Sequence, residues 1–186
     1  MLKTVSIKTC RIDDSSAVVL GGDVFFPLKE NRKKSKRIRY LSEYCKKILD
    51  ALSEGLFCGL ITELEYGIAR DVAGEHEFYR FLNERIKPSE KARFFRVMVV
   101  NVLDEYRQIS AYKELFKIVD TKGLHTPSMT SIITAVELKK PLVSYADDLW
   151  KYQKYIHDAY AERNNVKGFP LIFTPQDFYK SVLKSL

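Results

Sequence analysis

The stretch 124–149, LHTPSMTSIITAVELKKPLVSYADDL, constrains the fold more than any other part of the sequence. Thr126 followed by Pro127 is typical of a helix start, because threonine caps a first turn and proline suits the first helical position. Residues 141–145 are a short apolar run typical of a buried strand, and Asp147 and Asp148 follow it. A helix, a strand and an acidic turn in this order predict half of an α/β unit, whose chemistry belongs at the strand's carboxyl end.

Strand-like and helix-like segments alternate along the rest of the chain. Short apolar runs typical of strands cover residues 5–12, 17–20, 56–61, 141–145 and 169–173, with 116–119 as a further candidate. Helical spacing or capping residues predict helices over 41–52, after Thr62, over 75–84 and 89–117 with a break near Ile109, over 126–138, and after Asp147 and Thr174. This alternation predicts an α/β fold whose mainly parallel central sheet, of about four to five strands, is flanked by helices. The 186 residues suit one domain spanning 1–186.

A strongly basic run points to a polyanionic partner. The chain has a formal net charge of +7 and a pI of about 9.2. Much of that charge lies in residues 29–39, KENRKKSKRIR, where clustered cations would gain affinity for phosphates by releasing counterions. The same run is also compatible with a solvated loop and a first helical turn. The candidate nucleic-acid-binding residues are Arg32, Lys33, Lys34, Lys36, Arg37 and Arg39.

Several other classes of protein and site are disfavoured by the sequence. Three cysteines and three histidines without metal-ligand spacing argue against a disulfide scaffold or a zinc site. No nucleophile stands in a recognisable catalytic arrangement, and Gly21-Gly22 is too short for a phosphate-binding loop. The first ten residues lack a signal-peptide core, and no apolar run has the length of a membrane span, so we expect a cytoplasmic protein with no membrane partner.

Four stretches resemble the PIN-domain family of small α/β ribonucleases, which includes many toxins of toxin–antitoxin pairs. They are AVVLGGDVFFPL at 17–28, LITELEYGI at 60–68, the stretch 123–149, and LIFTPQDF at 171–178. The resemblance implies a divalent metal, Mg²⁺ or Mn²⁺, held by several carboxylates near a phosphodiester. It also implies RNA as a substrate or partner, an antitoxin-type protein partner, and a homodimer paired through helices.

Most of the acidic positions that the resemblance implies carry other residues in this chain. The acid that ends the first conserved strand of the family falls on Gly21, and the two acids around the last acidic strand fall on Ser128 and Ala146. Only Glu65 is acidic, and it also has a structural explanation as the third residue of a capping box that begins at Thr62.

Two rearrangements would restore part of an acidic centre. In the first, Asp23, Glu65, Asp147 and Asp148 form a shifted catalytic cluster, with Asp23, Glu65 and Asp147 as the metal ligands. In the second, Asp14 is the first acid. We prefer the first, because the second would place Gly21 and Gly22 inside a helix, where each glycine costs about 0.5 to 1 kcal/mol.

Three functions follow from this sequence. The preferred one is a PIN-like domain with an impaired nuclease centre that acts as a binding module for RNA or a ribonucleoprotein. The second is an active ribonuclease that uses Mg²⁺ or Mn²⁺ in the shifted cluster. The third is a protein-interaction scaffold that binds no nucleic acid.

Overall fold

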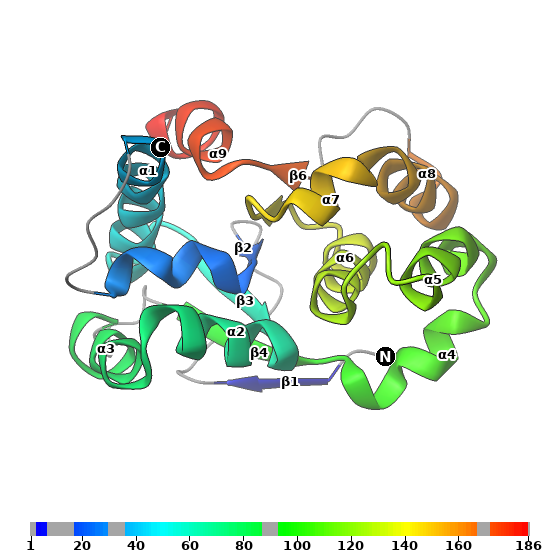
Figure 1. Cartoon of the computed structure of the whole chain (residues 1–186), viewed down its shortest axis with the longest axis horizontal. Helices are drawn as coiled ribbons and strands as arrows, with labels where there is room; N and C mark the ends of the chain where they lie inside the picture. The colour runs from blue at the N-terminus through cyan, green and yellow to red at the C-terminus, as the bar shows by residue number, and fades with distance from the viewer. Residues whose placement is uncertain (1–2, 7–16, 30–35, 87–92, 167–171, 186) are drawn as a thin grey trace.

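One mixed β-sheet runs through the computed structural model, which describes residues 3–6, 17–29, 36–86, 93–166 and 172–185 (Figure 1). Its strand order is β1-β4-β3-β2-β5-β6. The strands are β1 (Lys3–Ser6), β2 (Ala17–Leu20), β3 (Cys58–Thr62), β4 (Arg93–Met98), β5 (Leu142–Val143) and β6 (Ile172–Phe173). Strands β2 to β6 are parallel, and only β1 is antiparallel, to β4. The predicted mainly parallel α/β sheet is therefore confirmed, with an antiparallel edge strand in addition to its five parallel strands.

Helices cover both faces of this sheet, so its central strands are apolar on both sides. Within β2, Ala17 and Val19 belong to one buried cluster, whereas Val18 and Leu20 belong to the other. The first face is covered by η3 (Val100–Val102), α4 (Leu103–Arg107), η4 (Ser110–Tyr112), α5 (Lys113–Asp120), α6 (Thr126–Leu138), α7 (Asp147–Lys151) and α8 (Gln153–Asn164). The second is covered by η1 (Gly22–Leu28), α1 (Lys36–Ser53), α2 (Glu63–Ala73), α3 (Glu75–Arg80), η2 (Phe81–Arg85), α9 (Pro175–Ser181) and η5 (Leu183–Ser185). No helix in these described ranges has the length and apolar character needed to span a membrane.

Several helix ends follow the local signals of the sequence. Helix α1 ends at Ser53, and the Gly55 that follows has a φ of 74°, which lets the amide of Leu56 donate to the carbonyl of Ala51. Thr62 caps α2 by accepting a hydrogen bond from the amide of Glu65, and Thr174 caps α9 in the same way. These caps were predicted, and the structure confirms them.

Three predicted elements differ from the structure. The predicted helix 89–117 is wrong in its first part, because β4 occupies Arg93–Met98 and η3 and α4 follow it. Residues 116–119, a candidate strand, lie inside α5. The cap of α6 is one residue earlier than predicted, since His125 is the N-cap and Thr126 is the first helical residue. Of the strand predicted at 5–12, the structure describes only the start, within β1.

Candidate functional site

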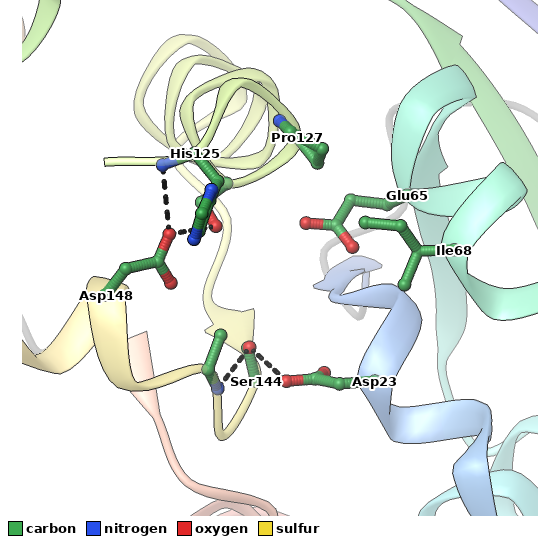
Figure 2. A pocket seen from close by; sticks show the side chains of 9 residues that line it. Asp23, Glu65, Ile68, His125, Pro127, Ser144 and Asp148 are labelled. Atoms are coloured by element: carbon green, nitrogen blue, oxygen red, sulfur yellow. Dashed lines mark hydrogen bonds between the residues drawn. The ribbon is translucent and has the colours of Figure 1, made fainter. Parts of the chain in front are cut away.

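A pocket of about 280 Å³ lies at the carboxyl ends of the parallel strands (Figure 2). One wall comes from η1 and α2, which follow β2 and β3, and the other comes from α6, the end of β5 and α7. The elements η1, α2 and α7 follow the carboxyl ends of β2, β3 and β5, and α6 begins at the same edge of the sheet, so side chains far apart in sequence meet there. The lining residues are Asp23, Glu65, Ile68, His125, Pro127, Ser128, Ser144, Ala146 and Asp148.

Asp23 joins the first turn of η1 to the end of β5. Its Oδ2 accepts hydrogen bonds from the hydroxyl of Ser144, at 2.8 Å, and from the amide of Tyr145, at 3.1 Å. Burial raises the pKa of Asp23 from 3.8 to about 6, although these hydrogen bonds oppose the shift. Asp23 therefore connects two strands' ends across the pocket floor, and it ionises less readily than an exposed aspartate.

Glu65 is a buried carboxylate that points from α2 toward η1. Its side chain is 6% exposed, and Oε2 accepts a hydrogen bond of 2.6 Å from the amide of Gly22. The carboxylate thus takes its hydrogen bond from η1, a neighbouring element on the same face of the sheet, and the Glu65 amide donates separately to the cap residue Thr62. Burial first, and then the nearby carboxylates of Asp23 and Asp148, raise the pKa of Glu65 to about 7.

Gly21 and Gly22, between β2 and η1, are required because neighbouring atoms leave no room for a side chain, and not because of an unusual backbone conformation. Gly21 has a φ of −68°, which any residue can adopt. A Cβ on Gly21 would lie 2.9 Å from Cβ of Ser144, and one on Gly22 would lie 2.5 Å from the carbonyl oxygen of Glu65. The sequence suggests only a flexible turn here. In the structure, these two glycines let η1 pack directly against β5 and α2.

Asp148 binds the start of α6 from the start of α7. Its Oδ2 accepts hydrogen bonds from the hydroxyl of Ser128, at 2.8 Å, and from the amide of His125, at 3.2 Å. Its Oδ1 accepts from the amide of Leu149 at 2.9 Å. Asp147, by contrast, is exposed and does not line the pocket. Of the adjacent aspartates, only Asp148 faces Glu65 across the pocket, as Figure 2 shows.

The structure brings together part of the predicted site. Asp23, Glu65 and Asp148 line one pocket, and so do Ser128 and Ala146, the uncharged residues at two of the positions where the family resemblance implies acids. Asp14 lies outside the described residues, as do Arg32, Lys33 and Lys34, while Lys36, Arg37 and Arg39 fall in the first turn of α1. Sequence reasoning missed the lining residues Ile68, His125, Pro127 and Ser144.

Ser144 is the most informative of these missed residues, because its hydroxyl is hydrogen-bonded to a residue in each wall of the pocket. It is 1% exposed, donates to Asp23 and accepts from the amide of Ala146 at 3.0 Å. A polar residue that ends an otherwise apolar strand is the one sequence signal that could have identified it.

The donor set does not fit the divalent metal that the resemblance implies. A hard cation such as Mg²⁺ needs several oxygen ligands directed at one point. Here Glu65 Oε2, Asp23 Oδ2 and both oxygens of Asp148 accept hydrogen bonds from protein groups. Within the part of the chain that the structure describes, no group of three or more His, Cys, Asp or Glu residues is placed to hold a metal ion. The carboxylates instead join the secondary-structure elements around the pocket.

Comparison of the chain with family models, with curated proteins and with solved structures found no match in any of the three.

Proposed function

We propose that this chain is a PIN-like domain whose acidic centre serves as a hydrogen-bonded junction, and that it acts as a binding module for RNA or a ribonucleoprotein. One observation carries the first part of the proposal: Ser128 stands where the resemblance implies an acid and donates its hydroxyl proton to Asp148 at 2.8 Å. A serine in this role supplies no negative charge to a cation. It stabilises the negative charge of a neighbouring carboxylate by hydrogen bonding instead.

The placement of Ser128 and Ala146 also supports the resemblance. Both residues line the same pocket as Glu65, the one acidic position that the chain retains. Positions aligned with one catalytic centre should lie together in the fold, and these three do. Since two of the three carry no charge, the pocket supports an impaired centre better than a working one.

The distribution of charge supports a polyanionic partner. Residues 29–53 contain nine Lys or Arg against three Asp or Glu, whereas the rest of the chain is almost balanced, with 22 against 21. Clustered positive charge of this kind favours binding to phosphates through counterion release. The excess lies in and just before α1, away from the carboxylates of the pocket in sequence.

A second candidate function is a metal-dependent ribonuclease. The observation that favours it is the convergence of Asp23, Glu65 and Asp148 on one pocket. Asp148 takes the place in this cluster that sequence reasoning gave to Asp147 as a metal ligand.

One experiment separates these functions: fluorescence anisotropy and gel analysis of a labelled RNA with the wild-type chain, in buffer with Mn²⁺ and in buffer with EDTA. We expect binding without Mn²⁺-dependent cleavage. Cleavage that is lost in Asp148→Ala but kept in Asp147→Ala would overturn the proposal in favour of the ribonuclease, because only Asp148 lines the pocket. If the chain neither binds nor cleaves the RNA, the remaining function is that of a protein-interaction scaffold.

A further inference from the structure

The two helices that begin and end the second layer pack together and combine cations with aromatic rings. Helix α9 lies beside α1 in Figure 1, and the two are in contact. We call the outer surface of this pair the α1–α9 face and define it by Glu43, Tyr44, Lys47, Tyr179 and Lys180. Glu43 and Lys180 are exposed, and the other three are half-buried.

A lysine is held between two tyrosine rings at the centre of the α1–α9 face. The ring centroids of Tyr44 and Tyr179 are 5.9 Å apart, with an angle of 58° between the rings. The Nζ of Lys47 lies 5.2 Å from the centroid of Tyr44 and 4.9 Å from that of Tyr179. A cation is attracted by the negative face of an aromatic ring, and Nζ of Lys47 also donates a hydrogen bond of 2.8 Å to the carboxylate of Glu43. The two rings and this ion pair together hold Lys47 in place.

Further cations extend this centre along both helices. The Nζ of Lys180 lies 5.9 Å from the Tyr44 centroid, and Lys184 is exposed one turn later, in η5. On α1, Tyr44 comes eight positions after Lys36, which is a rise of about 12 Å at 1.5 Å per residue. The basic start of α1 and the α1–α9 face are therefore within reach of one short polyanion.

We propose that the α1–α9 face binds single-stranded RNA, with Lys180 and Lys184 at phosphates and the Tyr44 and Tyr179 rings beside bases. The inference rests on the proposed function and names the surface that performs it. Single-stranded nucleic acids bind where a positive surface carries aromatic rings, because every base can stack and every phosphate is charged. An acidic protein would match the charge but would make no comparable use of the rings.

The test compares two double variants with equal charge. The first, Lys180→Gln/Lys184→Gln, changes the α1–α9 face and its extension. The control, Lys113→Gln/Lys117→Gln, changes exposed lysines of α5, at the opposite end of the molecule in Figure 1. Circular dichroism first establishes that both variants fold. Anisotropy then gives the Kd for a short labelled single-stranded RNA over a range of salt concentrations.

The salt dependence identifies the contact. Each phosphate contact on a single strand contributes about 0.7 to the slope of log Kd against log salt concentration, so the first variant should lose about 1.4 from the wild-type slope, and the control nothing. Equal slopes for the two variants, with RNA still bound by the wild type, would overturn the assignment of the face and leave the proposed function standing. Absence of RNA binding by the wild type would overturn both. Tighter binding of a labelled poly-glutamate than of RNA of equal charge would assign the face to an acidic protein.

Discussion

Ser128 donates a hydrogen bond of 2.8 Å to Oδ2 of Asp148, and this contact joins the first turn of α6 to the first turn of α7. The hydroxyl of Ser128 reaches a carboxylate that also binds the amide of His125. An acid at position 128 would therefore face another acid at hydrogen-bonding distance.

Replacing Ser128 by aspartate should destabilise the fold. The change removes a hydrogen bond to a charged group, worth about 1.5 to 3 kcal/mol, and adds like-charge repulsion against Asp148. Thermal and urea unfolding in EDTA measure the effect. Ser128→Asn is the matched control, because its amide has the size of aspartate and can still donate to Asp148. If both variants unfold at the same urea concentration, charge repulsion at this junction is negligible.

The stability of the wild-type protein should fall as the pH rises from about 4 to about 7. The folded-state pKa values of Asp23 and Glu65 are about 6 and about 7, above the ordinary values of 3.8 and 4.5. Between those limits the folded state binds more protons than the unfolded state, so the free energy of unfolding decreases as pH increases and levels off only above about pH 8, where Glu65 is ionised in both states.

Glu65→Gln isolates the contribution of one of these groups. Glutamine can still accept from the Gly22 amide but cannot ionise, so the variant should lose the part of the pH dependence that Glu65 causes, on the order of 3 kcal/mol between pH 4 and pH 8. Urea unfolding at several pH values measures it. Parallel pH profiles for the variant and the wild type would show that burial does not disfavour the charged form of Glu65.

Gly22→Ala should destabilise the protein, whereas Gly67→Ala should not. A Cβ on Gly22 would lie 2.5 Å from the Glu65 carbonyl oxygen and 2.8 Å from the Ala69 amide nitrogen, both backbone atoms of α2. Overpacking of this kind costs about 1 to 3 kcal/mol. Gly67 lies in the same helix and has no atom within 4 Å of an added Cβ, so alanine there should stabilise by about 0.5 to 1 kcal/mol. Urea unfolding of the two variants tests whether Gly22 is in close contact with the backbone of α2, and equal changes in the free energy of unfolding would contradict that contact.

Glu63→Ala should loosen the junction after β4. The Glu63 carboxylate accepts from the amide of Val99, at 2.8 and 2.9 Å, and from that of Val100 at 2.7 Å. Removing it leaves the amide of the fully buried Val99 without this acceptor, which costs about 1 to 3 kcal/mol. Hydrogen exchange of the two amides should accelerate. Glu105→Ala, an exposed acid on α4, is the control and should change neither stability nor exchange.

The sequence predicts most of this fold where turn and cap chemistry is local. Gly55, Thr62 and Thr174 mark helix boundaries through their own backbone or side-chain hydrogen bonds, so no distant residue is needed to interpret them. The prediction of a helix over the segment that forms β4 was wrong because the identity of this strand depends on packing against distant residues. Phe94 and Phe95 are adjacent and both buried, on opposite faces of a strand covered on both sides. Burial of both faces removes the alternation that would have identified the strand.

The site could be predicted only in outline. The acidic turn after β5 indicated the correct end of the sheet, but the choice between Asp147 and Asp148 depends on the rotation of α7 about its axis. The Ser144 contact to Asp23 depends on a pairing of β2 with β5 that spans more than half of the chain. Neither the rotation of α7 nor the pairing of β2 with β5 has a local sequence signal.

The antiparallel edge strand carries a consequence for biosynthesis. Lys3 pairs with Met98, so β1 can join the sheet only after β4 has left the ribosome. The residues of β1 must therefore wait, without their native partner, until those of β4 have been made. Because contacts so distant in sequence form late, we expect nascent chains truncated before β4 to leave β1 open to proteases and chaperones, and chains that include β4 to protect it.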